Sequence, residues 1–233
     1  MKPKFNFGLF FAFVFLIGLG LSAPTFGVWS GQTIVSDMEI KRVTPVKVKE
    51  TYVNPFADYI EANSDFEGWI EIGGTSIDDP LVKGLDNEHY LNFDYLDRRN
   101  SAGALYLDYR NQGNFYDNHM VIYGHYMQNG TKFHDLHLYK DKEFLENNSI
   151  ITLKGLRETK EYEIVSVQIV SAYTYYLILD LVDEGLEEYV KAMNRASIHE
   201  VNIEKKKDLK LLTLVTCTYE FDNARLLIHA IMK

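Results

Sequence analysis

A succession of short β-forming runs fills most of the chain after residue 68 and limits the folds that are open to it. The runs are rich in Ile, Val, Leu and Tyr, and clusters of Gly, Asn and Asp separate them, which is typical of β-sandwiches and β-barrels. The 16 Tyr and 14 Phe residues of the chain also suit the half-buried faces of a sheet. The expected strands cover 69–72, 79–84, 103–108, 120–124, 149–153, 161–173, 209–217 and 224–232. The sequence therefore predicts a mostly β domain.

Three segments have helical character. Pro55 can open a helix that continues towards Gly68, because apolar residues recur there at helical spacing. The segments 133–148 and 181–197 interrupt the β runs, and apolar residues of the second form a stripe along one helical face. We expect these helices at the periphery of a single domain that spans 55–233.

The amino-terminal segment predicts a membrane anchor. Two lysines precede an apolar run from Phe7 to Val28, which is long enough to cross a bilayer and leaves the amino end in the cytoplasm. The alternative is a cleaved signal peptide, although the best cleavage site has Leu21 where a small residue is preferred. We expect an uncleaved single-pass anchor over 1–28, a stalk over 29–54, and an exported domain outside the cell membrane.

The formal net charge of −9 argues against a nucleic-acid partner, because the chain offers no basic stripe to neutralise phosphates. We interpret this charge as a contribution to solubility. His125, His134 and His137 could form a metal site, but no carboxylate or second cysteine completes a familiar zinc pattern around them. We therefore expect no metal and no other cofactor.

Cys217 is the only cysteine, so it cannot form an internal disulfide. In an exported chain it is an inert core residue, an intermolecular link or a reactive thiol. If the runs 209–217 and 224–232 pair as a hairpin, Cys217 and Arg225 lie near the same end. A guanidinium at that place favours the thiolate and can bind an oxyanion. The alternative is an arginine in a surface ion pair with Glu220 or Asp222.

A thiol nucleophile usually needs a proton carrier, and His125 is the best placed of the seven histidines. It follows the run 120–124, so it lies where a strand ends, and Gly124 lets the backbone turn or approach a neighbour closely. His229 lies within a strand and is either a core or a surface residue. The remaining histidines have polar sequence neighbours and are expected to be exposed: His89, His119, His134, His137 and His199.

The stretch TLVTC, which ends at Cys217, closely resembles the TLxTC signature of sortases, the membrane-anchored cysteine transpeptidases of Gram-positive bacteria. The YGH stretch that ends at His125 and the CTYEFDNAR stretch that ends at Arg225 are similar to class B sortases in particular. A helix-containing insert before the cysteine strand adds to this resemblance. It covers residues 55–233, and an amino-terminal anchor is also found in this family.

The resemblance implies an eight-stranded β-barrel with amino-terminal helices beside it and a helix, 181–197, between the sixth and seventh strands. Cys217 would be the nucleophile and His125 the general acid and base. Arg225 would hold the substrate and stabilise the tetrahedral oxyanion. Tyr123, Val215 and Thr216 are expected to bind the substrate peptide. In some class B members the residue two before the cysteine is a Ser that helps to hold this peptide, and here it is Val215.

The implied activity is transpeptidation at the cell surface. The enzyme would cleave the C-terminal sorting motif of exported proteins through an acyl-thioester on Cys217. It would then pass the acyl group to an amine of a cell-wall precursor or to a pilin lysine, and hydrolysis would follow if water reached the thioester first. The alternative from a different class is an anchored, non-enzymatic β-domain adhesin with an inert buried cysteine. A papain-like hydrolase fits poorly, because its cysteine begins a helix near the mature amino terminus.

Overall fold

The computed structural model describes residues 54–173, 177–203 and 208–233. The expected anchor over 1–28 lies outside the described residues, as does all of the stalk except Asn54, so both stay predictions. None of the helices within these ranges has the length and apolar character that a membrane span requires.

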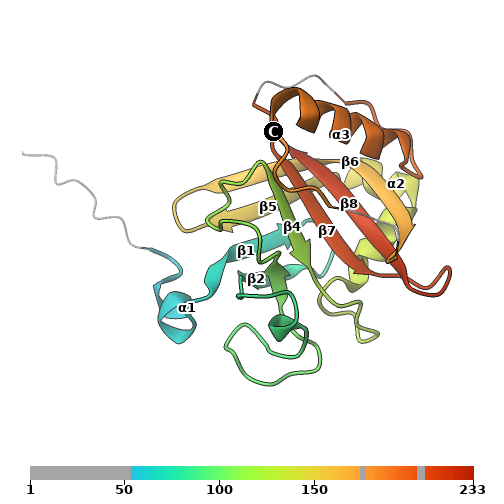
Figure 1. The fold of residues 1–233 in the computed structure, drawn as a ribbon. Helices are drawn as coiled ribbons and strands as arrows, with labels where there is room; N and C mark the ends of the chain where they lie inside the picture. The colour runs from blue at the N-terminus through green and yellow to red at the C-terminus, as the bar shows by residue number, and fades with distance from the viewer. Residues whose placement is uncertain (1–53, 174–176, 204–207) are drawn as a thin grey trace, which may run out of the picture. The chain divides into compact units, whose positions relative to one another are not determined.

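Eight strands within the described residues close into a barrel, with the spatial order β1-β2-β3-β4-β7-β8-β6-β5 (Figure 1). Neighbouring strands are antiparallel except for two parallel pairs, β2 with β3 and β4 with β7. The strands are β1 (Phe66–Ile72), β2 (Asp78–Val82), β3 (Leu105–Leu107), β4 (His119–Tyr123), β5 (Ile150–Gly155), β6 (Thr159–Ser171), β7 (Leu211–Cys217) and β8 (Ala224–Met232). The expected mostly β barrel is confirmed.

The barrel closes because alternate side chains of each strand are apolar and point to one side. In β1, buried and half-buried residues alternate along the whole strand. The interior is filled by large aliphatic and aromatic side chains, which include Ile70, Leu81, Leu105, Ile122, Leu153, Leu212, Leu214, Leu226 and Ile228. Residues of β7 and β8 that alternate with these lie on the outer face of the barrel.

The short helices lie between strands and are more broken than the sequence predicts. Helix α1 (Ala57–Ala62) ends well before Gly68, because the side chain of Asn63 donates to the carbonyl of Tyr95 at 3.0 Å and the backbone there is extended. The segment 133–148 forms a 3-10 helix, η2 (His134–Lys140), and a separate α2 (Lys142–Asn147). Asp141 divides them, because its carboxylate caps α2 by accepting from the backbone N–H of Phe144. A further 3-10 turn, η1 (His89–Leu91), lies between β2 and β3.

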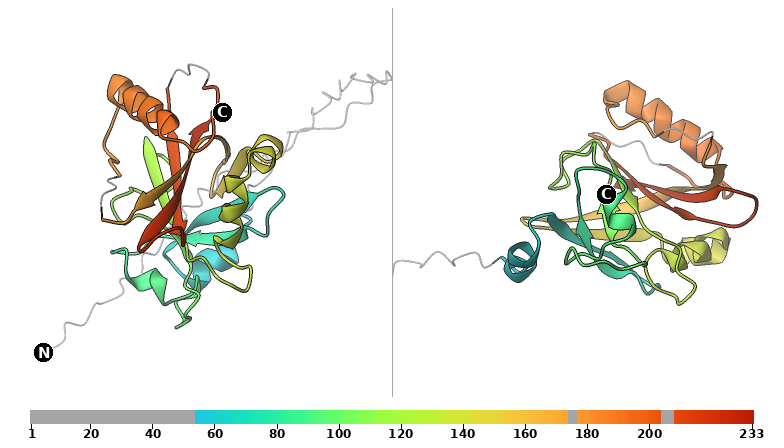
Figure 2. Two further views of the ribbon diagram at one scale, coloured as in Figure 1. Left: turned by 90° about the vertical axis from the view of Figure 1, so that its right-hand side faces the viewer. Right: turned by 60° about the horizontal axis from the view of Figure 1, so that its bottom comes forward.

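Helix α3 (Asp183–Arg195) connects β6 to β7 and confirms the helix expected in this insert. It lies on the outside of the barrel, next to β6 (Figure 2). Its buried residues, Leu186 and Val190, pack in one cluster with Val165 of β6, Leu211 of β7 and Ile231 of β8. The insert therefore covers part of the outer face of the sheet.

A chain of buried polar groups crosses the outer face beside this cluster. His119, Thr213 and His229 are completely buried. The His119 Nδ1 lies 2.6 Å from the carbonyl oxygen of Ile178, which can only accept, so this nitrogen carries the proton. The His119 Nε2 then accepts from the Thr213 hydroxyl at 2.8 Å, and that hydroxyl accepts from Nδ1 of His229 at 2.8 Å. The imidazole of His119 is therefore neutral, and it fastens the segment at Ile178 to the sheet.

Burial lowers the pKa of His119 to about 4 and the pKa of His229 to about 3. The unfolded chain binds these protons at the ordinary value near 6.5, so acid favours the unfolded state. We expect the free energy of unfolding to fall as pH drops from about 6.5 to about 4, by up to about 1.4 kcal/mol per pH unit for each histidine. Urea denaturation at a series of pH values measures this slope.

The variant His229→Asn isolates one of these contributions. Its amide replaces Nδ1 beside Thr213 but does not titrate. Between pH 6 and 4, the free energy of unfolding of this variant should change less steeply with pH than that of the wild type, by about 1.4 kcal/mol per pH unit. Equal slopes for the two proteins would show that His229 is not the group that takes up the proton on unfolding.

Candidate active site

The parallel pairing of β4 with β7 places the ends of both strands together. Tyr123, the last residue of β4, pairs with Val215, and the N–H of Gly124 donates to the Val215 carbonyl at 3.2 Å. His125 follows directly, and Cys217 is the last residue of β7. The two residues with the expected acid–base and nucleophilic chemistry therefore leave neighbouring strands at the same end of the barrel.

Arg225 is brought to the same end by the antiparallel pairing of β7 with β8. It is the register partner of Cys217, and directly opposed residues of an antiparallel pair project their side chains from the same face of the sheet. Both side chains are half-buried. The sheet thus fixes a thiol and a guanidinium side by side on the outer face.

The surface ion pair considered for Arg225 does not form. The Arg225 guanidinium donates through Nη1 to the carbonyl of Ala224 at 3.0 Å, and no carboxylate of the described residues pairs with it. Glu220 instead pairs with Lys140. Burial alone would raise the pKa of Glu220, but hydrogen bonds from Lys140 and Thr218 outweigh it and lower this pKa to about 2. The other donors of the guanidinium fork stay available to an oxyanion.

His125 is held outside the strand by close packing and one hydrogen bond. A Cβ atom at Gly124 would lie 2.3 Å from the side chain of Leu105 and 2.7 Å from that of Phe133, so only glycine fits immediately before the histidine. The His125 Nε2 lies 2.9 Å from the carbonyl oxygen of Leu91. Because a carbonyl only accepts, Nε2 carries the proton, and Nδ1 is the nitrogen that can exchange one.

Among the described residues, no hydrogen bond joins the sulfur of Cys217 to His125 or Arg225. Acid–base contacts in a site without substrate are commonly long and shorten when the reacting group lies between the partners. The structure places these three side chains at one end of the barrel, and their catalytic roles stay a prediction.

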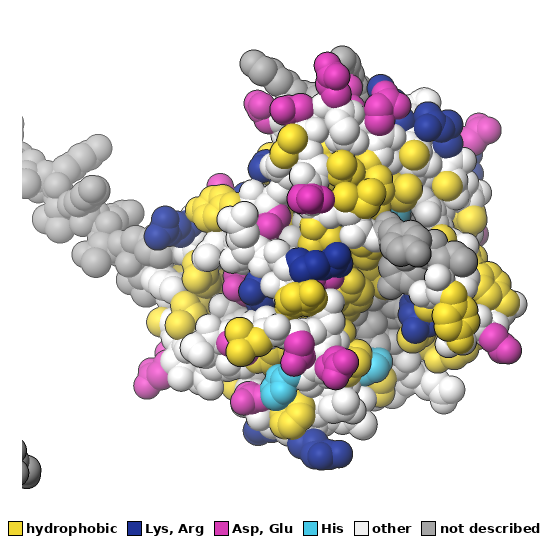
Figure 3. All heavy atoms as spheres, viewed as in Figure 1, with side chains coloured by type: hydrophobic (Ala, Val, Ile, Leu, Met, Phe, Trp, Pro, Cys, Tyr) yellow, Lys and Arg dark blue, Asp and Glu magenta, His cyan; other side chains and the backbone are white. Residues whose placement is uncertain are grey.

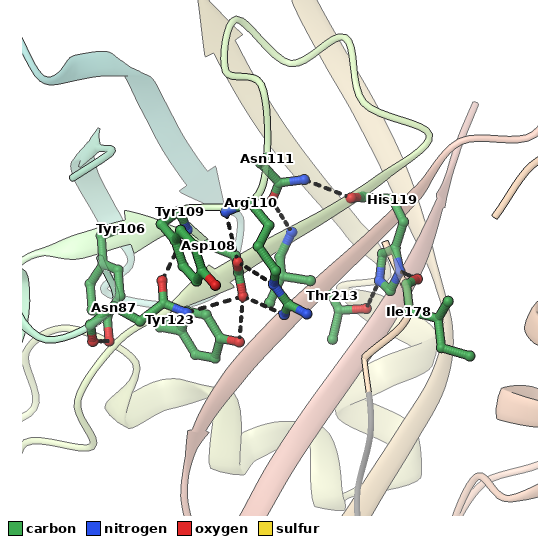
Figure 4. A network of polar contacts seen from close by, with 11 residues as sticks. Asn87, Tyr106, Asp108, Tyr109, Arg110, Asn111, His119, Tyr123, Ile178 and Thr213 are labelled. Atoms are coloured by element: carbon green, nitrogen blue, oxygen red, sulfur yellow. Dashed lines mark hydrogen bonds and ion pairs between the residues drawn. The ribbon is translucent and has the colours of Figure 1, made fainter. Parts of the chain in front are cut away.

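Tyr123 belongs to a polar network that the sequence does not reveal (Figure 4). Its hydroxyl donates to the carboxylate of Asp108 at 2.9 Å, and Arg110 donates to the same carboxylate through Nε at 2.8 Å and Nη2 at 2.7 Å. Asn87 donates to it as well, at 3.2 Å. Burial alone would raise the pKa of Asp108, but these hydrogen bonds hold it below its usual range. The network fixes the end of β4 that leads to His125.

The two other expected substrate-binding residues face opposite sides of β7. Val215 shares the face of Cys217 and packs with Val121, Leu177 and Leu227. Thr216 points to the barrel interior, and its buried hydroxyl has no hydrogen-bond partner among the described residues. Val215 is itself only 3% exposed, so neither side chain is open on the surface of the described residues.

The outer face beside Cys217 is apolar. Hydrophobic side chains gather in Figure 3 over the region in which β4 and β7 lie in Figure 1. The segment at Leu177 and Leu179 packs over this face, against Val121 and Val215. Acidic side chains also gather on α3 at the top of the view, and a few charged side chains lie among the hydrophobic ones.

The remaining histidines are less exposed than expected. His119 is completely buried, and His89, His134, His137 and His199 are half-buried. Within the described part of the chain, no group of three or more His, Cys, Asp or Glu side chains is arranged to hold a metal ion. His134 and His137 instead pack against the ring of Tyr126, with centroids 4.7 Å and 4.2 Å away.

The chain is similar in sequence and fold to proteins of one known family. The sortase domain family matches residues 70–233. Sortase B of Listeria monocytogenes is 30% identical over 195 residues, which cover 82% of this chain and 79% of that protein. The X-ray structure of Clostridium perfringens sortase B has a TM-score of 0.71 at 29% identity and covers 76% of this chain and 98% of that one. A Staphylococcus aureus sortase B–substrate complex has a TM-score of 0.71 at 25% identity and covers 78% of this chain and 86% of that one.

The matched residues include the whole barrel from Ile70 onwards and all three strand ends at which His125, Cys217 and Arg225 lie. The match therefore also includes the helix between β6 and β7 and the cysteine at the end of β7. This chain belongs to the sortase family of cysteine transpeptidases, and its relatives identify it as a class B sortase.

Proposed function

We propose that this protein cleaves the C-terminal sorting motif of exported proteins through an acyl-thioester on Cys217 and transfers the acyl group to an amine. The observation that carries the proposal is the strand register: Cys217 lies opposite Arg225, at the barrel end to which β4 also delivers His125. The related Staphylococcus aureus enzyme was solved as a substrate complex, which supports a peptide substrate here.

In the first step the sulfur of Cys217 attacks the carbonyl carbon of the motif's Thr. Nδ1 of His125 takes the thiol proton and gives it to the departing amine, so a C–S bond forms and the C–N bond breaks. The guanidinium of Arg225 meets the oxyanion that develops between these events. Nε2 of His125 keeps its proton throughout, because it donates to the carbonyl of Leu91.

In the second step an amine attacks the thioester carbon. A new C–N bond forms and the C–S bond breaks, while His125 takes a proton from this amine and gives it to the departing sulfur, so the thiol is restored. The acceptor is an amine of a cell-wall precursor or a pilin lysine. Water in its place gives net hydrolysis.

The sorting peptide lies extended along the outer face of β4 and β7. Val215 has no hydroxyl and lies beneath the segment at Leu177, so it shapes the wall behind the peptide. Tyr123 lines the same face with its own hydroxyl engaged by Asp108. Thr216 contributes through its backbone. Residues 1–28 anchor the enzyme in the cell membrane as a single span, and the barrel works on the outside.

The decisive experiment incubates the domain with a library of sorting peptides and an amine acceptor, and identifies the products by mass spectrometry. Cys217→Ala should abolish cleavage and leave the fold intact, with a change in stability of about 1 kcal/mol or less. A methanethiosulfonate reagent should label the wild type at this single thiol and stop its turnover. Residual cleavage in the Ala variant would exclude Cys217 as the nucleophile.

Arg225→Lys tests the oxyanion role. It keeps the charge but loses the guanidinium fork, so kcat/KM should fall about 100- to 1000-fold, the cost of removing one oxyanion donor. Arg98→Lys is the matched control, because Arg98 is largely exposed and pairs with Asp94. Near-normal kinetics for Arg225→Lys would contradict the assignment.

His125→Gln tests the proton transfer. Gln keeps a donor for the carbonyl of Leu91 but cannot carry a proton, so acylation should slow by a factor of about 100 to 10,000. Stopped-flow measurement of the first released amine reports this step, and His89→Gln serves as the control. An unchanged burst of amine would show that another group protonates the leaving amine.

A further inference from the structure

The imidazole of His137 contacts the main chain at the cysteine. Its Nε2 lies 3.1 Å from the carbonyl oxygen of Cys217. His137 belongs to η2, which lies far from β7 in sequence, so this hydrogen bond is a tertiary contact at the residue that bears the thiol. It reaches the carbonyl of the last residue of the strand, at the point where the ladder between β7 and β8 ends.

Lys140 fixes the proton of this imidazole. Its Nζ lies 3.2 Å from Nδ1 of His137. An ammonium can only donate, so Nδ1 accepts and Nε2 carries the proton that it donates to the carbonyl of Cys217. Lys140 also donates to the hydroxyl of Thr218 at 2.7 Å and pairs with Glu220. Lys140 therefore holds the imidazole and the turn after Cys217 together.

The same imidazole also contacts the segment that bears His125. Tyr126 is the next residue after His125, and its ring lies against the ring of His137 with centroids 4.2 Å apart. The ring of Tyr219, in the turn after β7, contacts the ring of Tyr126 edge to face, with centroids 5.5 Å apart. One side chain thus bonds the backbone of the nucleophile and packs on the neighbour of the proton carrier.

We infer that His137 is a positioning residue: its neutral imidazole holds the backbone of Cys217 and, through Tyr126, the segment of His125 in the relative placement that attack on the peptide requires. This inference rests on the proposed function, because it gives those two residues their roles. The sequence alone predicts His137 to be an exposed histidine, and nothing in the strand pattern points to its contact with Cys217.

Protonation of His137 would break this arrangement. A second N–H at Nδ1 would face the ammonium of Lys140, and their hydrogen bond would be lost. Burial lowers the pKa of His137, the charges of Lys140 and His134 act in the same direction, and the carbonyl of Cys217 and Glu220 oppose them. Tyr126 and Tyr219 supply the remaining titratable groups of the stack. The imidazole is neutral at pH 7 and gains its proton below the ordinary value of 6.5.

Two variants test the inference. His137→Leu removes the hydrogen bonds, so kcat should fall about tenfold, the size expected for one ordinary hydrogen bond, with KM unchanged. His137→Gln keeps an amide donor for the carbonyl of Cys217, so it should retain most of the wild-type kcat. Because this amide does not titrate, the part of the fall in kcat at acid pH that His137 causes should be absent. His199→Gln is the matched control, because His199 also lies within hydrogen-bond distance of a backbone carbonyl, that of Tyr139, at 3.0 Å.

The rate at which a methanethiosulfonate reagent modifies Cys217 gives a readout that needs no substrate, and thermal unfolding checks the fold of each variant. The pH profile of this rate should change in His137→Leu and stay the same in His199→Gln. Wild-type kinetics and labelling in His137→Leu would overturn the inference, as would an equal loss of kcat in the Gln and Leu variants. If the wild type cleaves no sorting peptide but the rate of Cys217 labelling still differs between the wild type and His137→Leu, the proposed function fails and the role of the contact at Cys217 stands.

Discussion

Parallel hydrogen bonding between β4 and β7 joins two parts of the chain that are far apart in sequence, and the candidate site depends on this pairing. The register places Tyr123 beside Val215, so His125 and Cys217 both lie two residues beyond a paired position. Successive strand residues face opposite sides, so a slip of one residue in β7 would turn the thiol into the barrel interior. Main-chain pairing thus fixes the relative positions of the residues of the candidate site.

Buried polar groups make that register specific. The outer face of β4, β7 and β8 is mostly apolar, and apolar side chains tolerate a shifted partner. Thr213 is the register partner of His229 and also bonds His119, so one hydroxyl links all three strands. A shifted register would leave one ring nitrogen of each of the two buried imidazoles without its Thr213 partner, which costs more than the loss of apolar contact. The strands that deliver His125, Cys217 and Arg225 are the ones this chain of groups connects.

The sequence predicted what local patterns determine and missed what distant residues determine. The β-rich runs and the turn residues between them placed the strands, and the expected hairpin placed Cys217 and Arg225 near the same end, where the structure pairs them. The early end of α1 depends on a bond from Asn63 to Tyr95, which no local pattern contains. His119 and His137 have polar sequence neighbours, yet the segment at Ile178 covers the first and the stack on Tyr126 half-buries the second. Polar neighbours in sequence say little about which segment packs over a side chain.

The three predicted catalytic residues are held with different rigidity, and the difference suits a reaction with two amines. Cys217 and Arg225 lie within paired strands, so the distance between their backbones is set by the sheet. His125 lies beyond the end of β4 and is held by the packing at Gly124 and one hydrogen bond to the carbonyl of Leu91. In the proposed reaction the nucleophile and the oxyanion donor keep one geometry towards the carbonyl in both steps. The proton carrier serves a leaving amine and then an entering one. A side chain on a loop that is anchored at one nitrogen meets this second requirement, because its other nitrogen can follow the amine while the tautomer stays fixed.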